Sequence, residues 1–556
     1  VVIPGSVLEI EEQAFKYCYK LAEIEFADEN ETTLTIRTEA FYGCDLTYVE
    51  LPRNARVIET SAFGYNDNLT TVKVNSDNNE GTEALKFADG ITQDSASYSS
   101  RYSYVTTVII GKNAAEFDVG GAFGGSNNSL AKIEVEEGNQ YYYSDSEGVL
   151  YNSQKTKIIF YPALKATMFT IPSTVEEIAS GCFRNRTALV SFNIGKNIKK
   201  IGDNAFDGCT NLNSLTFDND RTEDLEIGAS AFNKCSSLVS VTLPAHTTKL
   251  GDKAFRYCEK LTSITLPDEL EEIGSNAFYS CKSLVSITIP KSVNKLGANN
   301  GTNNELIDCF EACENLATFI VANDNASFTS YDGVIYGKED GVARTLIFAS
   351  SALSGDIVIP KTVNYIVSNA FYANSKITNV AFEDGKSAVS VVNGVETEGT
   401  LTIGSKVFYE CTNLVSVQLP NLTSIPDETF SSCTNLTNFE VPNTVASIGQ
   451  RAFANCSNFV NLTFEEGNDS NSLIIADASY YWYAAFYGCR VENLVLPKRL
   501  TYVGDYAFGY SKIQNVIFPA GLSYLGTSAF EDCNELESVT FDANCKLTEL
   551  KSYTFS

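Results

Sequence analysis

Cysteine and histidine are the residue types in this chain that could carry chemistry. The chain has 15 cysteines but one histidine, His246, in 556 residues. Cysteines can form disulfides, bind zinc or act as nucleophiles, and the last two roles require other ligands or a base close by. The sequence has no C-x2-C pair, and a single histidine excludes any site built on two.

Most of the cysteines instead keep a fixed distance from a phenylalanine. Twelve of them lie three residues after a Phe: Cys18, Cys44, Cys209, Cys235, Cys258, Cys281, Cys313, Cys411, Cys433, Cys456, Cys489 and Cys533. Cys182 and Cys309 directly precede a Phe, and Cys545 lies elsewhere. Because free cysteine behaves as a small buried apolar residue, this spacing predicts a column of reduced, buried thiols.

The other polar residues give no catalytic or metal-binding pattern. His246 lies in LPAHTTKLG, a spacer without a nucleophile nearby. The acidic runs DNDRTED (218–224) and ADENET (27–32) contain oxygen ligands that calcium prefers, but neither has EF-hand spacing. Phosphate-binding glycine motifs are absent from the sequence. We therefore expect no enzyme activity, no metal and no cofactor.

These cysteines and phenylalanines belong to a repeat that is clearest at residues 250–290. Its unit is A-F-x-x-C-x-x-L-x-x-I-x-L-P, and most steps span about 22 to 26 residues, a period typical of a solenoid. The Phe column comprises Phe15, Phe41, Phe63, Phe123, Phe183, Phe206, Phe232, Phe255, Phe278, Phe310, Phe371, Phe408, Phe430, Phe453, Phe486, Phe508, Phe530 and Phe555.

Each repeat predicts one short strand and one turn. Two alternating apolar residues, such as Ile264 and Leu266, follow the repeat leucine and indicate a strand. Eleven of the 13 prolines come directly after this run, where strand pairing must stop. The strands all run in one direction, so we expect a curved parallel sheet on the concave side. We interpret the A-F segment as a short turn, or a 3₁₀ or helical turn, on the convex side.

Five insertions interrupt the repeat. SEGVLYNSQKTKIIFYP and YDGVIYGKEDGVARTLIFA predict β-hairpins within 139–165 and 323–353. Irregular segments lie at 75–105, 385–400 and 468–483. Because the repeat resumes after each one, we expect a single continuous solenoid over residues 1–556.

The repeated units resemble the BspA-like leucine-rich repeats. The resemblance rests on IPSTVEEI (171–178), IGDNAFDGCTNL (201–212), LGDKAFRYCEKLTSITLP (250–267) and IGSNAFYSCKSLVSITIP (273–290), and it covers nearly the whole chain. It implies a leucine-rich solenoid displayed at the surface of bacteria or protists, associated with adhesion to host matrix proteins and with co-aggregation. It implies no catalytic residues.

The outward positions of the strands are the candidate binding residues. Since side chains alternate along a strand, we expect the residues between the apolar ones to face the concave side of the solenoid. In the central repeats these are Ser191, Asn193, Ser214, Thr216, Ser240, Thr242, Ser263, Thr265, Ser286 and Thr288. They predict a ladder of hydroxyls that could bind a partner. The alternative is that Ser and Thr simply suit an exposed strand.

The composition of the chain excludes several classes of binding partner. The net charge of −29 opposes binding to nucleic acid or to an anionic membrane, and no apolar run is long enough to span one. Both ends fall inside repeats, so we expect a segment of a longer extracellular or cell-surface protein. We predict an adhesin-like module for a host or matrix protein, a glycan or a neighbouring cell. The alternative is a structural protein that self-assembles through its solenoid ends or edges.

Overall fold

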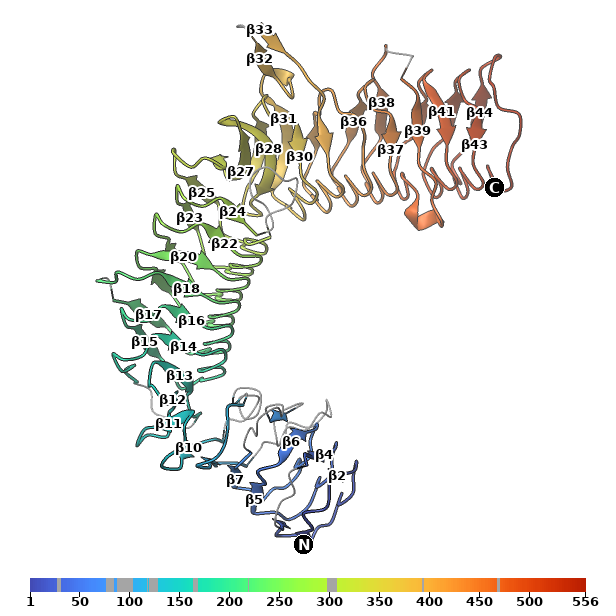
Figure 1. Ribbon diagram of the computed structural model, residues 1–556. Coiled ribbons are helices and arrows are strands. Elements are labelled where there is room, and N and C mark those ends of the chain that lie inside the picture. Colours follow the sequence, from blue (N-terminus) through green and yellow to red (C-terminus); the bar gives the residue numbers. More distant parts are fainter. Residues whose placement is uncertain are drawn as a thin grey trace. The chain divides into compact units, whose positions relative to one another are not determined.

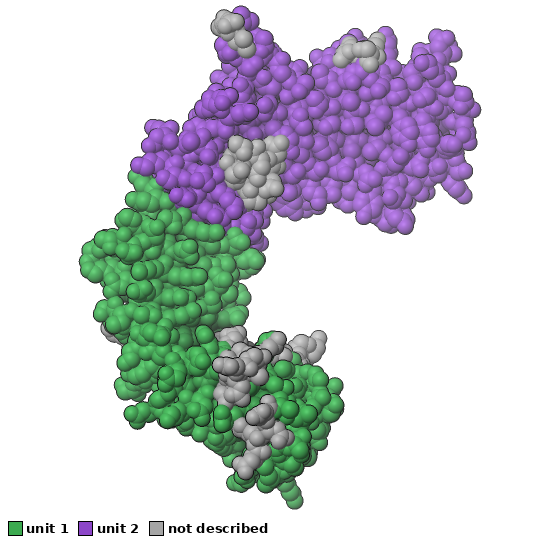
Figure 2. All heavy atoms as spheres, in the orientation of Figure 1, with its two compact units in different colours: residues 1–270 green, residues 271–556 purple. Residues whose placement is uncertain are grey.

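The computed structural model describes residues 1–27, 32–76, 85–87, 104–117, 119, 129–163, 169–218, 220–297, 308–392, 395–467 and 471–556. These residues form two units, Val1–Leu270 and Glu271–Ser556, coloured separately in Figure 2. In both units the chain winds as a parallel β-solenoid, as the sequence predicted (Figure 1). No helix among these residues could span a membrane.

Each regular coil contributes two strands, although the sequence predicted one. The first is the predicted strand, for example β21 (Ser263–Thr265). The second follows the turn after the first strand and ends at the I-G dipeptide, for example β16 (Lys200–Ile201). Corresponding strands of successive coils pair in parallel and build two sheets, here the first sheet and the second sheet.

The strands of unit 1 divide between the two sheets. The first sheet contains β1 (Val2–Ile3), β3 (Glu25–Phe26), β5 (Tyr48–Leu51), β7 (Thr71–Val74), β9 (Thr107–Ile110), β10 (Lys132–Val135), β15 (Ser191–Ile194), β17 (Ser214–Phe217), β19 (Ser240–Thr242) and β21. The second contains β2 (Glu9–Ile10), β4 (Leu34–Ile36), β6 (Ala55–Ile58), β8 (Lys86–Phe87), β14 (Glu177–Ile178), β16, β18 (Leu225–Ile227) and β20 (Thr247–Leu250).

Unit 2 repeats this arrangement. Its first sheet contains β23 (Ser286–Ile289), β25 (Thr318–Val321), β29 (Gly355–Ile359), β31 (Ile377–Phe382), β35 (Ser416–Val417), β36 (Asn438–Val441), β38 (Asn461–Phe464), β40 (Asn493–Val495), β42 (Asn515–Phe518) and β44 (Ser538–Phe541). The second contains β22 (Glu272–Ile273), β24 (Lys295–Leu296), β30 (Tyr365–Ile366), β34 (Thr402–Ile403), β37 (Ser447–Ile448), β39 (Leu473–Ile475), β41 (Leu500–Val503) and β43 (Tyr524–Leu525).

Three insertions form antiparallel strands within the described residues. The insertion at 139–165 contains β11 (Tyr142–Ser144), β12 (Leu150–Asn152) and β13 (Lys157–Phe160), and that at 323–353 contains β26 (Phe328–Tyr331), β27 (Val334–Glu339) and β28 (Val342–Ala349). A smaller hairpin, β32 (Ser390–Val392) with β33 (Val395–Thr397), projects from unit 2 (Figure 1). Short 3₁₀ segments are η1 (Glu383–Gly385) and η2 (Tyr481–Tyr483). Most of 75–105 lies outside the described residues.

The A-F segment folds as successive tight turns, so the helical and 3₁₀ alternatives were wrong. Asn204 and Gly208, on either side of Phe206, have φ of 55° and 75°. Such left-handed residues cannot belong to a right-handed helical turn. Their N–H groups instead donate to the next coil, at 2.8 Å to Ala229 O and 2.9 Å to Asn233 O. We call this stack of turns the turn wall.

The Phe column packs against the inner side of the turn wall and forms the centre of the core. Phe206 stacks on Phe183 with ring centroids 4.8 Å apart and on Phe232 at 5.2 Å. The described column members are fully buried except Phe15 and Phe555, in the first and last repeats, which are partly buried. Phe123 lies outside the described residues.

The cysteine column is confirmed as free thiols. Thirteen of the 15 cysteines are buried, Cys545 is half-buried, and Cys18 is the exposed exception. Most thiols of the column donate to the Phe carbonyl of the preceding coil, as Cys209 Sγ does to Phe183 O at 3.0 Å. The cysteine therefore caps a carbonyl and fills a small space beside the ring.

Removing one ring should show how much the column contributes. We expect Phe206→Ala to lower the free energy of unfolding by about 3–5 kcal/mol, because it leaves a cavity between two stacked rings. Thr216→Ala, at an exposed outward position of the same coil, should change it by less than about 0.5 kcal/mol. Urea unfolding followed by circular dichroism measures both, and equal effects would contradict a core role for the column.

The buried thiols should resist modification and make the fold sensitive to alkali. Burial raises the pKa of Cys44 to about 11 and that of Cys209 to about 12, from an ordinary value of 9.0. Because the thiolate is the reactive form, a thiol reagent at pH 8 should label Cys18 and Cys545 in the folded protein and all 15 cysteines in denaturant.

The same shifts set the direction of the pH dependence. The folded pKa of these thiols lies above the unfolded one, so their stabilising effect is complete below pH 9 and declines as the pH rises from 9 towards 12. The urea midpoint should thus be lower at pH 10 than at pH 8. A Cys209→Ala variant should show a shallower decline between these two pH values.

Candidate functional site

The outward residues of the first sheet lie where the sequence placed them. Along β17, Leu215 and Phe217 are buried whereas Ser214 and Thr216 are exposed. The same alternation holds in β15, β19, β21 and β23. All ten predicted residues are exposed, namely Ser191, Asn193, Ser214, Thr216, Ser240, Thr242, Ser263, Thr265, Ser286 and Thr288.

Strand pairing brings these side chains into register. In unit 1, Ser191 pairs with Ser214 in one row, and Ser240 pairs with Ser263 further along. Adjacent parallel strands lie about 4.8 Å apart, so the hydroxyls follow one another at that interval. In unit 2, Thr288 pairs with Ile320, which is 52% exposed. An apolar side chain therefore takes the place of a hydroxyl there.

Eight of these ten side chains form no hydrogen bond within the described part of the chain. Asn193 and Thr216 are the exceptions, since Thr216 Oγ1 donates to Asn193 Oδ1 at 2.8 Å and Asn193 Nδ2 donates to Asp218 at 3.1 Å. The other eight are exposed without such a partner: Ser191, Ser214, Ser240, Thr242, Ser263, Thr265, Ser286 and Thr288. They can donate to and accept from a ligand without breaking an internal bond.

In unit 1 the outward residues of the second sheet are charged, unlike the hydroxyl residues of the first sheet. Its outward row alternates in charge and in register through Lys157, Glu177, Lys200, Glu226 and Lys249. Neighbours of opposite charge face each other, as in the Lys157–Glu177 pair at 2.9 Å. The other members of the row also face residues of opposite charge on the paired strands, so this surface is charged where the first sheet carries hydroxyls.

The N-terminal strands of the first sheet carry charged outward residues that form ion pairs with one another. Lys73 Nζ lies 3.2 Å from Glu50 and 2.9 Å from Glu136. The hydrogen bonds from Lys73 and from the N–H of Lys112 lower the pKa of Glu136 below its usual value. This part of the face differs from the hydroxyl ladder because its polar groups already bind one another.

One asparagine, buried at Asn325 and half-buried at Asn139, fixes each of the two larger insertions. Asn325 donates at 2.8 Å to the carbonyls of Pro290 and Val293, and its Oδ1 accepts the N–H groups of Ser327 and Phe328. Asn139 makes the equivalent bonds to Gly111 and Ala114 and to the start of β11. The asparagine thus clamps the insertion to the preceding coil.

The insertions are three-stranded, not the simple hairpins predicted. β11, β12 and β13 pair antiparallel, and β13 then pairs in parallel with β14 of the second sheet. In unit 2, β26, β27 and β28 do the same, with β28 pairing in parallel with β30. The last strand of each insertion is therefore also a strand of the solenoid, which holds the insertion rigidly in place.

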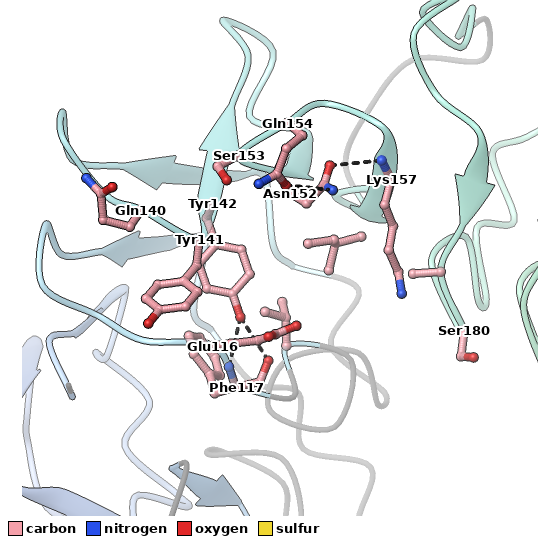
Figure 3. Close-up of a pocket in the computed structure, with 13 residues that line it drawn as sticks. Glu116, Phe117, Gln140, Tyr141, Tyr142, Asn152, Ser153, Gln154, Lys157 and Ser180 are labelled. Carbon is pink, nitrogen blue, oxygen red and sulfur yellow. Dashed lines mark hydrogen bonds between the residues drawn. The ribbon is translucent and has the colours of Figure 1, made fainter. Parts of the chain in front are cut away.

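A polar cavity of about 450 Å³ lies beside the first insertion in unit 1 (Figure 3). Figure 3 shows Tyr141 and Tyr142 on one side, Glu116 below them and Lys157 across from them. The Tyr142 hydroxyl accepts the N–H of Phe117 at 2.8 Å and donates to its carbonyl at 3.0 Å. With charges of both signs in its lining, this cavity suits a polar ligand better than an apolar one.

His246 and the carboxylates of the acidic run at 218–224 contact neighbouring residues of the chain. His246 occupies a turn with φ of 64°, and its Nδ1 lies 3.7 Å from Asp224. Asp218 accepts the N–H of Lys196 at 3.3 Å, and Asp220 accepts Lys196 Nζ at 2.5 Å. Most of the run at 27–32 lies outside the described residues.

The repeat matches a known family over most of its length. Comparison with protein-family models matches the BspA type leucine rich repeat region in six copies, at residues 1–118, 156–226, 225–332, 344–393, 387–473 and 482–556. The chain belongs to the BspA-type leucine-rich repeat family. No curated protein matches it.

Several solved structures have a similar chain. They include a leucine rich cell surface protein from Faecalibacterium prausnitzii, at 23% identity over 59% of this chain and 94% of that one, with a TM-score of 0.40. The pneumococcal vaccine antigen PcpA is 20% identical over 72% and 99%, with a TM-score of 0.49. A leucine-rich repeat protein from Bacteroides ovatus is 20% identical over 72% and 92%, with a TM-score of 0.42.

Sequence reasoning missed the asparagine clamp, although a signal for it exists. NQYYYS (139–144) and NASFTS (325–330) share an asparagine, an aromatic residue three positions later and a serine five positions later. The serine also has a fixed role, because Ser144 Oγ and Ser330 Oγ accept the N–H groups of Val135 and Val321. Aligning the two insertions would have revealed this motif.

Asn325→Ala tests the clamp. It leaves two buried carbonyls and two N–H groups without partners, so we expect the free energy of unfolding to fall by about 3 kcal/mol. Hydrogen exchange at Ser327 and Phe328 should accelerate with it. Asn315→Ala, which removes one exposed bond to the carbonyl of Lys282, should cost less than about 1 kcal/mol. An equal loss in both variants would contradict the clamp.

Proposed function

We propose that this protein is a non-enzymatic, surface-displayed binding module of adhesin type. It engages a host or matrix protein, a glycan or a neighbouring cell surface through the outward face of the first sheet and through the inserted hairpins. The observation that carries the proposal is the row of six exposed Ser and Thr hydroxyls on the first sheet of unit 1, none of which has a side-chain hydrogen bond within the described residues. On the second sheet of the same unit the outward row is charged, with Lys157 and Glu177 paired at 2.9 Å.

The family and the fold support this choice. Leucine-rich solenoids bind partners over extended surfaces, which arise because each coil adds one more strand to the same face. The extracellular location is the one that the resemblance to BspA-like repeats implies. The hairpins add relief to an otherwise regular surface, and the cavity beside β11 gives one of them a recess for a polar group.

Large side chains introduced on the outward face of the first sheet should weaken partner binding. We expect the double variant Ser240→Trp/Ser263→Trp to weaken binding to a matrix protein, glycan or cell surface by at least about tenfold, or about 1.4 kcal/mol. The two side chains lie directly opposite on paired strands, so the variant blocks the middle of the ladder. Biolayer interferometry against immobilised fibrous matrix proteins, together with a glycan array, measures the loss.

Lys200→Trp on the second sheet of the same unit is the matched control, and it should bind as the unmodified protein does. Equal binding by all variants would show that the first sheet is not the contact surface. Light scattering after size exclusion tests the alternative of self-assembly. Filaments or large oligomers that form without a partner would favour a structural protein over an adhesin.

A further inference from the structure

The second insertion leaves a gap in the Phe column of unit 2. In a regular coil the column Phe donates its N–H to the residue before the next column Phe, as Phe278 does to Cys309 O at 2.8 Å. In the coil that carries the second insertion, Ala349 makes this bond, to Ala370 O at 3.0 Å. An alanine methyl therefore occupies the column position that a phenylalanine ring fills elsewhere.

The first insertion shows the filled version of the same position. There Tyr161 donates its N–H to Cys182 O at 3.1 Å, and its ring lies 5.0 Å from the ring of Phe183. Two equivalent insertions thus differ in one side chain. With Tyr161 the aromatic column is continued, and with Ala349 it is interrupted.

A cavity of about 550 Å³ opens at the interrupted position. Four aromatic side chains line it: Tyr279, Phe310, Phe348 and Tyr372. Phe310 and Phe348 are buried, whereas Tyr372 is 49% exposed. The volume lies within the range of pockets that accept small ligands or single side chains.

Two carboxylates, Glu311 and Glu314, complete the lining, which contains no lysine or arginine among the described residues. Neither carboxylate forms an ion pair or a side-chain hydrogen bond within that part of the chain. The closest contact with a cation is Lys376 Nζ at 3.4 Å from the backbone oxygen of Glu314. Burial, followed by the neighbouring Asp308, raises the pKa of Glu311 above its ordinary value.

The same wall already holds a cation against an aromatic ring one coil further on. Lys406 Nζ lies 5.7 Å from the centroid of Tyr409, whose ring stacks on Tyr372 at 5.2 Å and 6°. Cations bind the faces of aromatic rings, and more strongly where water is partly excluded. Tyr372 therefore has an aromatic neighbour with a cation on one side and a vacant aromatic pocket on the other.

We propose that this pocket binds the side chain of a lysine or arginine presented by a partner protein, with the aromatic rings enclosing the alkyl chain and Glu311 and Glu314 binding its charge. The proposal names one contact of the adhesin function and rests on it for the source of the side chain. A net charge of −29 favours the approach of basic segments to this surface.

The test uses a dye-labelled peptide, acetyl-Ala-Ala-Lys-Ala-Ala-amide, and the same peptide with Nε-acetyl-lysine, which keeps the alkyl chain and removes the charge. Fluorescence polarisation with the full chain should show saturable binding of the lysine peptide, at least fivefold weaker binding of the acetylated one, and weakening by salt. Glu311→Gln and Tyr372→Leu should each weaken the lysine peptide by at least fivefold.

Ala349→Tyr is the sharpest variant because it copies Tyr161 of the first insertion into the gap. It should abolish peptide binding while the protein stays folded, with a urea midpoint no lower than that of the unmodified chain. Glu410→Gln, on the same wall but outside the pocket, should bind normally. Equal binding of the two peptides, or undiminished binding by Ala349→Tyr, would overturn the proposal.

The result is separable from that of the first-sheet test. A protein that binds the lysine peptide but no matrix protein, glycan or cell supports the pocket and contradicts the adhesin function. One that binds a partner through Ser240 and Ser263 but not the lysine peptide supports the adhesin function and contradicts the pocket.

Discussion

The in-register stacking of identical turns is the constraint on which the rest of this structure depends. Each turn of the wall donates three N–H groups to the next, for example from Asn204, Phe206 and Gly208. These bonds form only if every coil presents the same backbone at the same height. They also offset the left-handed residues in each turn, which cost on the order of 1 kcal/mol or more apiece outside glycine.

Stacking separates the residues that build the coil from those free to evolve contacts. A column Phe touches equivalent rings above and below, so a change in one coil damages three. The cysteine beside it is bound in the same way to the preceding coil. The outward positions of the first sheet take no part in this packing, since Ser240 and Ser263 are exposed to solvent. The conspicuous residues of the repeat are therefore structural, and the plain ones are available for binding.

This separation explains what could be predicted from the sequence. Apolar residues at fixed spacing, such as Phe255 and Ile264, report burial directly, and the prolines mark strand ends. The second sheet was missed because strands such as Lys200–Ile201 have two residues, too few for alternation to show. The conformation of the A-F turn was misjudged because Ser230 and Lys253 give no sign in the sequence that their φ is positive.

The interrupted coils were the least predictable part, for a physical reason. Whether an insertion leaves a gap depends on which residue returns to the column, and that depends on register across three antiparallel strands with bulges. Tyr161 and Ala349 look unrelated in the sequence, yet the same backbone bond places both in the column. In a regular coil each ring fills the space above its neighbour, as Phe206 does between Phe183 and Phe232. Both cavities described above adjoin an insertion, so the insertions shape the surface as much as the repeat does.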